Sequence, residues 1–202
     1  MSTELLAATE HLVLSWMTDD DAAALAAYRS DPVQARYQSW DTPYPIDSAR
    51  ALIAEMRNVR FAQPGVWLQV GIENKGRLIG DIAVRVDGDE IRQATVGFTL
   101  AAEAQGHGYA TGALRKVISL LFTEHDVHRI YADCDSRNDR SVALLERIGM
   151  RREAALHHKS AWWNTPKPAD IWTRPRRPRT SSSRLTQNEP VAGTVSCPVC
   201  GS

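Results

Sequence analysis

The chain has 202 residues, which is enough for one domain with a substantial core and too few for two full-sized domains. Its hydrophobic fraction of 43% and charged fraction of 24% exclude a disordered chain, and no apolar run reaches the roughly 18 residues of a membrane span. Basic and acidic residues balance at 24 each, but from Thr165 onward six basic residues face two acidic ones, so the remainder is mildly acidic and favours an amine over nucleic acid as partner.

The first quarter of the chain is predicted to contain a strand and two helices. Residues 11–16 are apolar and strand-like. Thr18 and the three aspartates after it are typical of a helix N-cap, and an alanine-rich helix through about Arg29 follows. A second amphipathic helix is predicted because apolar residues recur at helical spacing at Ala49, Leu52, Ile53 and Met56.

The apolar period changes to two after Pro64-Gly65. Residues 66–72 and 78–86 alternate on the two sides of a turn at residues 74–76, which predicts a β-hairpin. Asp87-Gly88-Asp89 supplies a further turn, and residues 94–100 continue the alternation. The three segments together predict an antiparallel meander.

From the strand at residues 94–100 onward, the predicted order becomes strand, glycine loop, helix, strand, helix. A glycine loop at residues 106–108 opens a helix whose apolar face runs to Leu121, and residues 130–134 form a short strand. A last helix ends at Gly149, a residue typical of helix C-termini. We therefore expect an α/β (α+β) domain with an antiparallel front and a strand-helix-strand back half.

The composition changes after Asn164 to prolines, arginines and serines, with Trp172 as its one large apolar anchor. We therefore assign residues 5–163 to the domain and 164–202 to a mostly disordered tail. Proline cannot donate to a sheet ladder, so we expect no central final strand in this segment. Cys197 and Cys200 have half of a zinc-site spacing without a second pair, and no metal is expected.

The most informative stretch joins the strand at 96–100 to the helix that Gln105-Gly106-His107-Gly108-Tyr109-Ala110-Thr111 opens. A glycine-rich turn at a helix N-terminus presents unpaired backbone N–H groups, and the helix dipole adds partial positive charge. Such a turn can bind a pyrophosphate. Gly106 and Gly108 allow the close approach, and Gln105 and Thr111 can add side-chain hydrogen bonds.

Two motifs resemble the GNAT superfamily of N-acetyltransferases, in the branch of RimJ and RimL. Gln105, Gly108 and Ala110 match the first motif, and the segments 138–141 and 144–150 are similar to the second. The resemblance implies a mixed, mostly antiparallel central sheet flanked by helices, with two adjacent parallel strands that splay apart to receive acetyl-CoA.

The resemblance also implies roles for individual residues. The backbone of Phe98, Thr99 and Leu100 is expected to bind the acetyl and pantetheine groups, and residues 105–111 the pyrophosphate. Asn138 is expected to contact the pantetheine arm, to cap the following helix, or both. Ser141 is the candidate proton donor to the departing thiolate, or else an ordinary residue of the first helical turn.

We therefore expect an enzyme that transfers an acetyl group by direct attack of an amine on acetyl-CoA, the cosubstrate. The acceptor is a protein N-terminus or a small amine such as an aminoglycoside. The general base is open: RimL-like relatives carry a carboxylate where this chain has Ser160, which leaves water, Glu90, His157 or His158. Trp40, Tyr44 and Trp67 are either pocket aromatics or core residues.

The unusual C-terminus motivates a second hypothesis, a catalytically impaired protein that binds acyl-CoA without turnover. The chain starts without the basic and apolar pattern of a secretory signal, and its three cysteines form no disulfide framework. We expect a cytoplasmic protein with neither a membrane nor nucleic acid as partner, and homodimer formation stays open.

Overall fold

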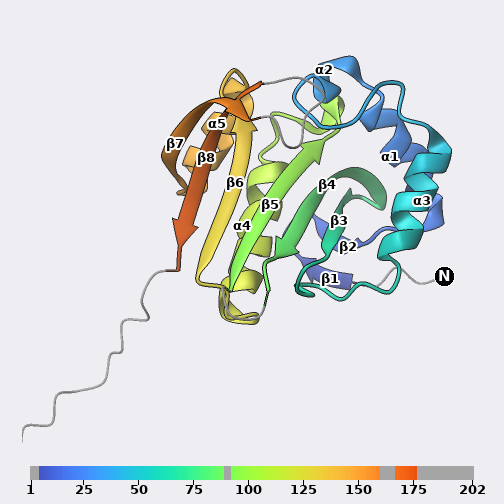
Figure 1. Cartoon of the computed structure of the whole chain (residues 1–202). Helices are drawn as coiled ribbons and strands as arrows, with labels where there is room; N and C mark the ends of the chain where they lie inside the picture. Colours follow the sequence, from blue (N-terminus) through green and yellow to red (C-terminus); the bar gives the residue numbers. More distant parts are fainter. Residues whose placement is uncertain (1–4, 89–91, 160–166, 177–202) are drawn as a thin grey trace, which may run out of the picture.

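The computed structural model describes residues 5–88, 92–159 and 167–176. In these ranges a single sheet of eight strands has the order β1-β2-β3-β4-β5-β6-β8-β7. Helices flank it: α4 (Tyr109–Thr123) lies behind β5 and β6, and α1 (Ala22–Arg29) and α3 (Ile46–Met56) lie beside β4 and β3 (Figure 1). The strands are β1 (Leu5–Ala8), β2 (Val13–Trp16), β3 (Trp67–Asn74), β4 (Arg77–Val86), β5 (Gln93–Leu100), β6 (Arg129–Asp135), β7 (Arg151–Lys159) and β8 (Lys167–Pro175).

The predicted N-terminal helices are confirmed. The capping segment at Thr18 begins a short 3-10 turn, η1 (Asp19–Asp21), in which the Asp21 carboxylate accepts a hydrogen bond from the Thr18 amide at 2.7 Å. This turn continues into α1 (Ala22–Arg29), and α2 (Pro32–Ala35) follows as an additional short helix. The second predicted helix is α3 (Ile46–Met56), and it buries Ala49, Ile53 and Met56.

The predicted meander is confirmed as β3, β4 and β5, paired antiparallel along the chain. The turn between β3 and β4 places Lys75 and Gly76 at φ of 50° and 71°, the positive values that a tight hairpin turn requires. The backbones of β4 and β5 approach each other closely at Gly80, where an added Cβ would lie 2.3 Å from the Thr99 carbonyl oxygen. Only glycine therefore lets β4 pack against the end of β5 at this point.

The expected mixed sheet with splayed strands is confirmed at β5 and β6. These two strands are parallel and pair only from Gln93↔Arg129 to Thr95↔Tyr131. The connection between them is η2 (Ala102–Ala104) followed by α4 (Tyr109–Thr123). After β6 the chain forms α5 (Asp139–Arg147), which ends before Gly149 at φ 81°.

The expectation that the proline-rich segment holds no central final strand is wrong. β8 lies between β6 and β7 and pairs antiparallel with both, so the sheet extends past the expected domain boundary at residue 163. Pro175 is the last residue of β8, and Pro168 falls opposite an irregularity between Leu156 and Lys159. The six residues between the two prolines can donate to the ladder, and Trp172 there is buried to 2% exposure.

The tail from 177 to 202, with Cys197 and Cys200, lies outside the described residues. Within the part of the chain that is described, no helix is both long enough and apolar enough to cross a membrane.

Candidate active site

The separation of β5 from β6 opens a cavity of about 310 Å³. Beyond Thr95 the strand β5 keeps β4 as its neighbour, and beyond Tyr131 the strand β6 keeps β8, but β5 and β6 no longer pair with each other. Residues 95–98 of β5 and 133–135 of β6 line the cavity from its two sides. The facing backbone edges of the two strands are therefore available to an extended ligand.

Small residues form the floor of this cavity. Ala83 on β4 pairs directly with Gly97 on β5, and both residues line the cavity. The adjacent row of the sheet is Trp67, Arg85 and Thr95, which are paired across three strands. Side chains opposite one another project from the same face, so the missing bulk at Gly97 leaves a hollow beside larger side chains.

The segment after α2 crosses over the opening. Gln38 Nε2 donates a hydrogen bond to Thr99 Oγ1 on β5 at 3.2 Å. Tyr37 donates its hydroxyl proton to the carbonyl oxygen of Arg137, which follows β6, at 3.4 Å. Because the segment is attached on both sides of the gap, residues 37–39 cover the cavity between the two strands.

Three consecutive residues of β6, Asp133 to Asp135, line the cavity. The Asp135 carboxylate accepts two hydrogen bonds from the Arg137 guanidinium, at 2.9 and 2.6 Å, and this pair fixes the end of the strand. Burial, and then the charge of Asp170, raises the pKa of the Cys134 thiol to about 12. Cys134 is therefore a neutral thiol at physiological pH. Asp133 is half-buried and lines the cavity.

The turn before α4 has the properties of an anion-binding site. Gly106 and Gly108 have φ of 81° and 78°, and residues 106–108 are exposed. No described residue accepts a hydrogen bond from the backbone amides of residues 106–111; the first α4 amide that is paired belongs to Gly112, which donates to Gly108. Successive unpaired amides at a helix N-terminus suit a phosphate.

The other predicted residues of this turn have partners inside the protein. Gln105 donates to the Leu100 carbonyl at 3.1 Å and accepts from Arg140 at 2.7 Å, so its amide connects β5 to α5. The rings of His107 and Tyr109 are stacked with centroids 5.4 Å apart. The Thr111 hydroxyl accepts a hydrogen bond from the Arg147 guanidinium on α5 at 3.4 Å, so it already has a partner.

Asn138 and Ser141 both line the cavity, at the N-terminus of α5. Asn138 caps this helix, because its side-chain oxygen accepts a hydrogen bond from the Ser141 amide at 3.2 Å. The Ser141 hydroxyl is not used in this contact. The structure thus brings the predicted Phe98, Asn138 and Ser141 to one cavity, while Thr99 and Leu100 lie further along β5.

Several residues that the sequence suggests for the site have other placements. Trp40 and Tyr44 pack around Arg29, at 4.4 and 5.2 Å from their ring centroids, whereas Trp67 lines the cavity. Glu90 and Ser160 lie outside the described residues, as do the side chains of His157 and His158. Sequence reasoning assigned no site role to most of the cavity residues, and those among them with side chains suited to bind a ligand are Tyr37, Gln38, Arg85 and Asp133. Arg85 and Asp133 occupy the polar positions of alternating strands, so no departure from the pattern marks them.

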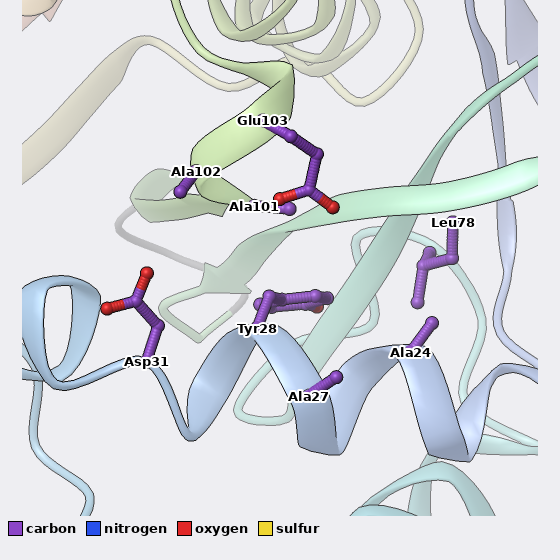
Figure 2. Close-up of a pocket in the computed structure, with 8 residues that line it drawn as sticks. All are labelled: Ala24, Ala27, Tyr28, Asp31, Leu78, Ala101, Ala102 and Glu103. Atoms are coloured by element: carbon purple, nitrogen blue, oxygen red, sulfur yellow. The ribbon is translucent and has the colours of Figure 1, made fainter.

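A second pocket of about 220 Å³ lies between α1 and η2, and Tyr28 lies between these elements in Figure 2. Alanines form much of its lining, together with the carboxylates of Asp31 and Glu103. Asp31 is already used as the N-cap of α2, where it accepts from Val33 at 2.8 Å. Because this pocket contains no splayed strand edges, whereas the cavity between β5 and β6 is lined by two of them, that cavity is the better candidate site.

Comparisons with known proteins agree with this choice. Residues 11–151 match a family model described as acetyltransferase (GNAT) domain. The uncharacterized N-acetyltransferase p20 of Bacillus licheniformis is 26% identical over 148 residues, which cover 73% of this chain and 83% of that protein. The matched family range includes β5, the glycine turn, α4 and α5.

Two solved structures share the fold. RimJ of Mycobacterium smegmatis, in complex with a CoA-disulfide, has a TM-score of 0.69 and 24% identity, with 86% of this chain and 85% of that chain covered. RimL, a ribosomal alpha-N-protein acetyltransferase, has a TM-score of 0.75 and 16% identity, with 87% and 96% covered.

Proposed function

The chain belongs to the GNAT acetyltransferase family, and on that premise we propose that it transfers an acetyl group from acetyl-CoA to a primary amine by direct attack. The main observation behind the proposal is the gap between β5 and β6 together with a turn of unpaired amides. The turn is connected to the cavity by the hydrogen bond between Gln105 and Arg140, a residue between the cavity residues Asn138 and Ser141. One extended ligand with a pyrophosphate in its middle can occupy both features. Acetyl-CoA has this form, and the complex of RimJ with a CoA-disulfide supports the assignment.

The residues present fit this cosubstrate. The backbone amides of residues 106–111 would bind the pyrophosphate, with Gly106 and Gly108 in the positive-φ conformation that a close approach needs. The backbone of Phe98 would bind the acetyl end, with Asn138 at the other side of the gap. Thr99 and Leu100 continue the same strand edge and are proposed to bind the pantetheine arm, with the Leu100 carbonyl already accepting from Gln105. In acetyl transfer the nitrogen of the amine bonds to the thioester carbonyl carbon, and the bond from that carbon to sulfur breaks.

Two proton movements accompany this exchange of bonds. The amine loses a proton and the departing thiolate gains one, so the reaction needs a proton acceptor and a proton donor. Ser141 is the proposed donor, since its hydroxyl is at the cavity while its amide is engaged by Asn138. Asp133 is a further candidate for the acceptor side, because its carboxylate lines the cavity on β6, across from Gly97.

The acceptor is proposed to be a protein N-terminus or a small amine, with aminoglycosides as an alternative class. The printed name of RimL, an alpha-N-protein acetyltransferase, supports a protein N-terminus. The hypothesis of an impaired acyl-CoA-binding protein depended in part on a missing final strand. That reason no longer applies, because β8 is present in the sheet.

Calorimetry with CoA and acetyl-CoA, followed by a thiol-trapping assay of CoA release, tests the proposal. The assay uses peptides with free N-termini, small amines and an aminoglycoside, with an acceptor-free blank to subtract protein thiols. We expect acetyl-CoA binding and CoA release with at least one acceptor. Binding without release across the whole panel would favour the impaired protein, and absence of binding by folded protein would overturn both hypotheses.

A further inference from the structure

The charges around the cavity narrow the choice of acceptor. We infer that the acceptor is a compact amine that carries an anionic group, and that Arg85 binds this group. The inference rests on the proposed acetyl transfer and names the chemical class of its second substrate.

Arg85 is a cation at the cavity with a weak partner inside the protein. Its Nε lies 3.9 Å from Asp87 Oδ1, which is too long for a hydrogen bond. This Nε is buried and has no hydrogen-bond partner among the described residues. A buried donor without an acceptor is costly, and a guanidinium binds a carboxylate or phosphate through two parallel hydrogen bonds. Arg85 is therefore suited to an oxyanion that arrives with a ligand.

A carboxylate lies on the opposite side of the hollow at Gly97. Asp133 on β6 lines the same cavity as Arg85 on β4, and Gly97 lies on β5 between these two strands. The ammonium of an approaching acceptor would meet Asp133, and its anion would meet Arg85. A polycation would instead place its second charge against the guanidinium, which is unfavourable in a partly buried site.

Strand geometry sets the spacing between the two groups of the acceptor. Arg85 pairs with Thr95, three residues before Phe98, where the proposed acetyl site begins. With a rise of about 3.3 Å per residue and about 4.8 Å between strands, the Cα atoms of Arg85 and Phe98 lie roughly 11 Å apart. Once its guanidinium turns from Asp87 toward Phe98, the arginine side chain covers part of this distance. About two extended residues, roughly 7 Å, would then connect the amine to the anion, which is the size of a dipeptide.

Paired acceptors that differ only in charge test the inference. The first pair is a dipeptide with a free carboxylate, as a model of a small acidic amine, and the C-terminal amide of the same dipeptide as its neutral partner. The second pair is a tripeptide amide with Glu or Gln as its second residue, which represents a peptide N-terminus. A linear diamine of similar length is the polycation. The ratio of kcat/KM between the acid and its neutral partner is measured for wild type, Arg85→Met, Arg85→Lys and Arg77→Met.

We expect wild type to prefer the acid by about tenfold or more in at least one pair, and the responding pair identifies the source of the anion. Arg85→Met should bring the ratio close to 1, and Arg85→Lys should keep part of it. Arg77→Met is the matched control, since Arg77 is an exposed residue of the same strand outside the cavity, and it should keep the wild-type ratio.

Three results would overturn the inference while leaving acetyl transfer in place: equal rates for acid and neutral partner, a ratio that Arg85→Met does not change, or the diamine as best acceptor. A loss of the ratio in Arg77→Met would also overturn it, because the preference would then reflect overall charge. Failure of the proposed acetyl transfer can be distinguished from failure of this inference, because folded protein would then release no CoA with any of these acceptors.

Discussion

At the scale of single residues, the Ser141 hydroxyl can be removed without disturbing its helix. The α5 cap is the hydrogen bond from the Ser141 backbone amide to Asn138, and alanine retains that amide. Alanine is also a good helix former. We predict that Ser141→Ala lowers kcat by about a hundredfold or more, the usual effect of losing a proton donor, with acetyl-CoA affinity and Tm unchanged. Calorimetry, thermal unfolding and steady-state kinetics measure the three quantities, and an unchanged kcat would leave Ser141 as an ordinary helix residue.

The Cys134 thiol at the cavity makes the stability of the protein depend on pH in the alkaline range. Burial raises the pKa of this thiol from its ordinary 9.0 to about 12, so the native state holds the proton over a range in which the unfolded chain releases it. The contribution of Cys134 to the free energy of unfolding is fully present below about pH 9 and decreases as the pH rises toward 12. We predict that Cys134→Ala loses less unfolding free energy than wild type between pH 8.5 and about 10.5 in urea titrations. Parallel pH curves for the two proteins would contradict the assigned pKa.

The candidate site was only partly predictable from single residues. The glycine turn and Ser141 belong to local motifs, and local spacing is enough to find them. Arg85 and Asp133 come together only because β4 and β6 both flank β5, and no local pattern shows that order. Alternation in a strand assigns each residue to a face of the sheet, but the neighbouring strands decide whether that face is covered or hollow.

At the scale of elements, α4 offers a comparison between two glycines. Gly108 is the N-cap at φ 78°, and an alanine there would be strained by about 1 kcal/mol or more although no atom lies within 4 Å of its Cβ. Gly112 is inside the helix, with its nearest contact at 3.9 Å. We predict that Gly108→Ala weakens CoA binding, whereas Gly112→Ala keeps the affinity and raises Tm because alanine favours the helix. Calorimetry would contradict the proposed pyrophosphate site if both variants bound CoA equally well.

Elements with strong local signals were the ones predicted correctly. The meander and helices α1, α3, α4 and α5 follow from apolar periods and from capping or turn residues that are close in sequence. The strand β8 follows instead from pairing with β6 and β7, which precede it in the chain. The prediction from its prolines was wrong because proline at the end of a strand or at an irregularity removes no ladder hydrogen bond.

At the scale of the whole molecule, β8 joins the last part of the sheet. It pairs with β6 from Arg129↔Pro175 to Asp135↔Ala169 and with β7 on its other edge. Trp172 and Thr173 in β8 are 2% and 0% exposed. The strand that forms one side of the cavity, β6, is therefore supported from residues that lie beyond the boundary expected from composition.

Two truncations test where the domain ends. We predict that a chain ending at Arg176 keeps the Tm and CoA affinity of the full chain, because it retains every strand of the described sheet. A chain ending at Asn164 should lose its cooperative unfolding transition or aggregate. Deleting β8 leaves β6 and β7 without a common neighbour and removes buried Trp172, and the loss of one buried tryptophan side chain alone costs about 3 to 5 kcal/mol. That is a large part of the roughly 5 to 15 kcal/mol that stabilises a typical domain.

Calorimetric scanning and CoA titration of both chains decide the boundary. If the shorter chain unfolded cooperatively at the wild-type Tm and bound CoA, β8 would be dispensable and the domain would end near residue 163.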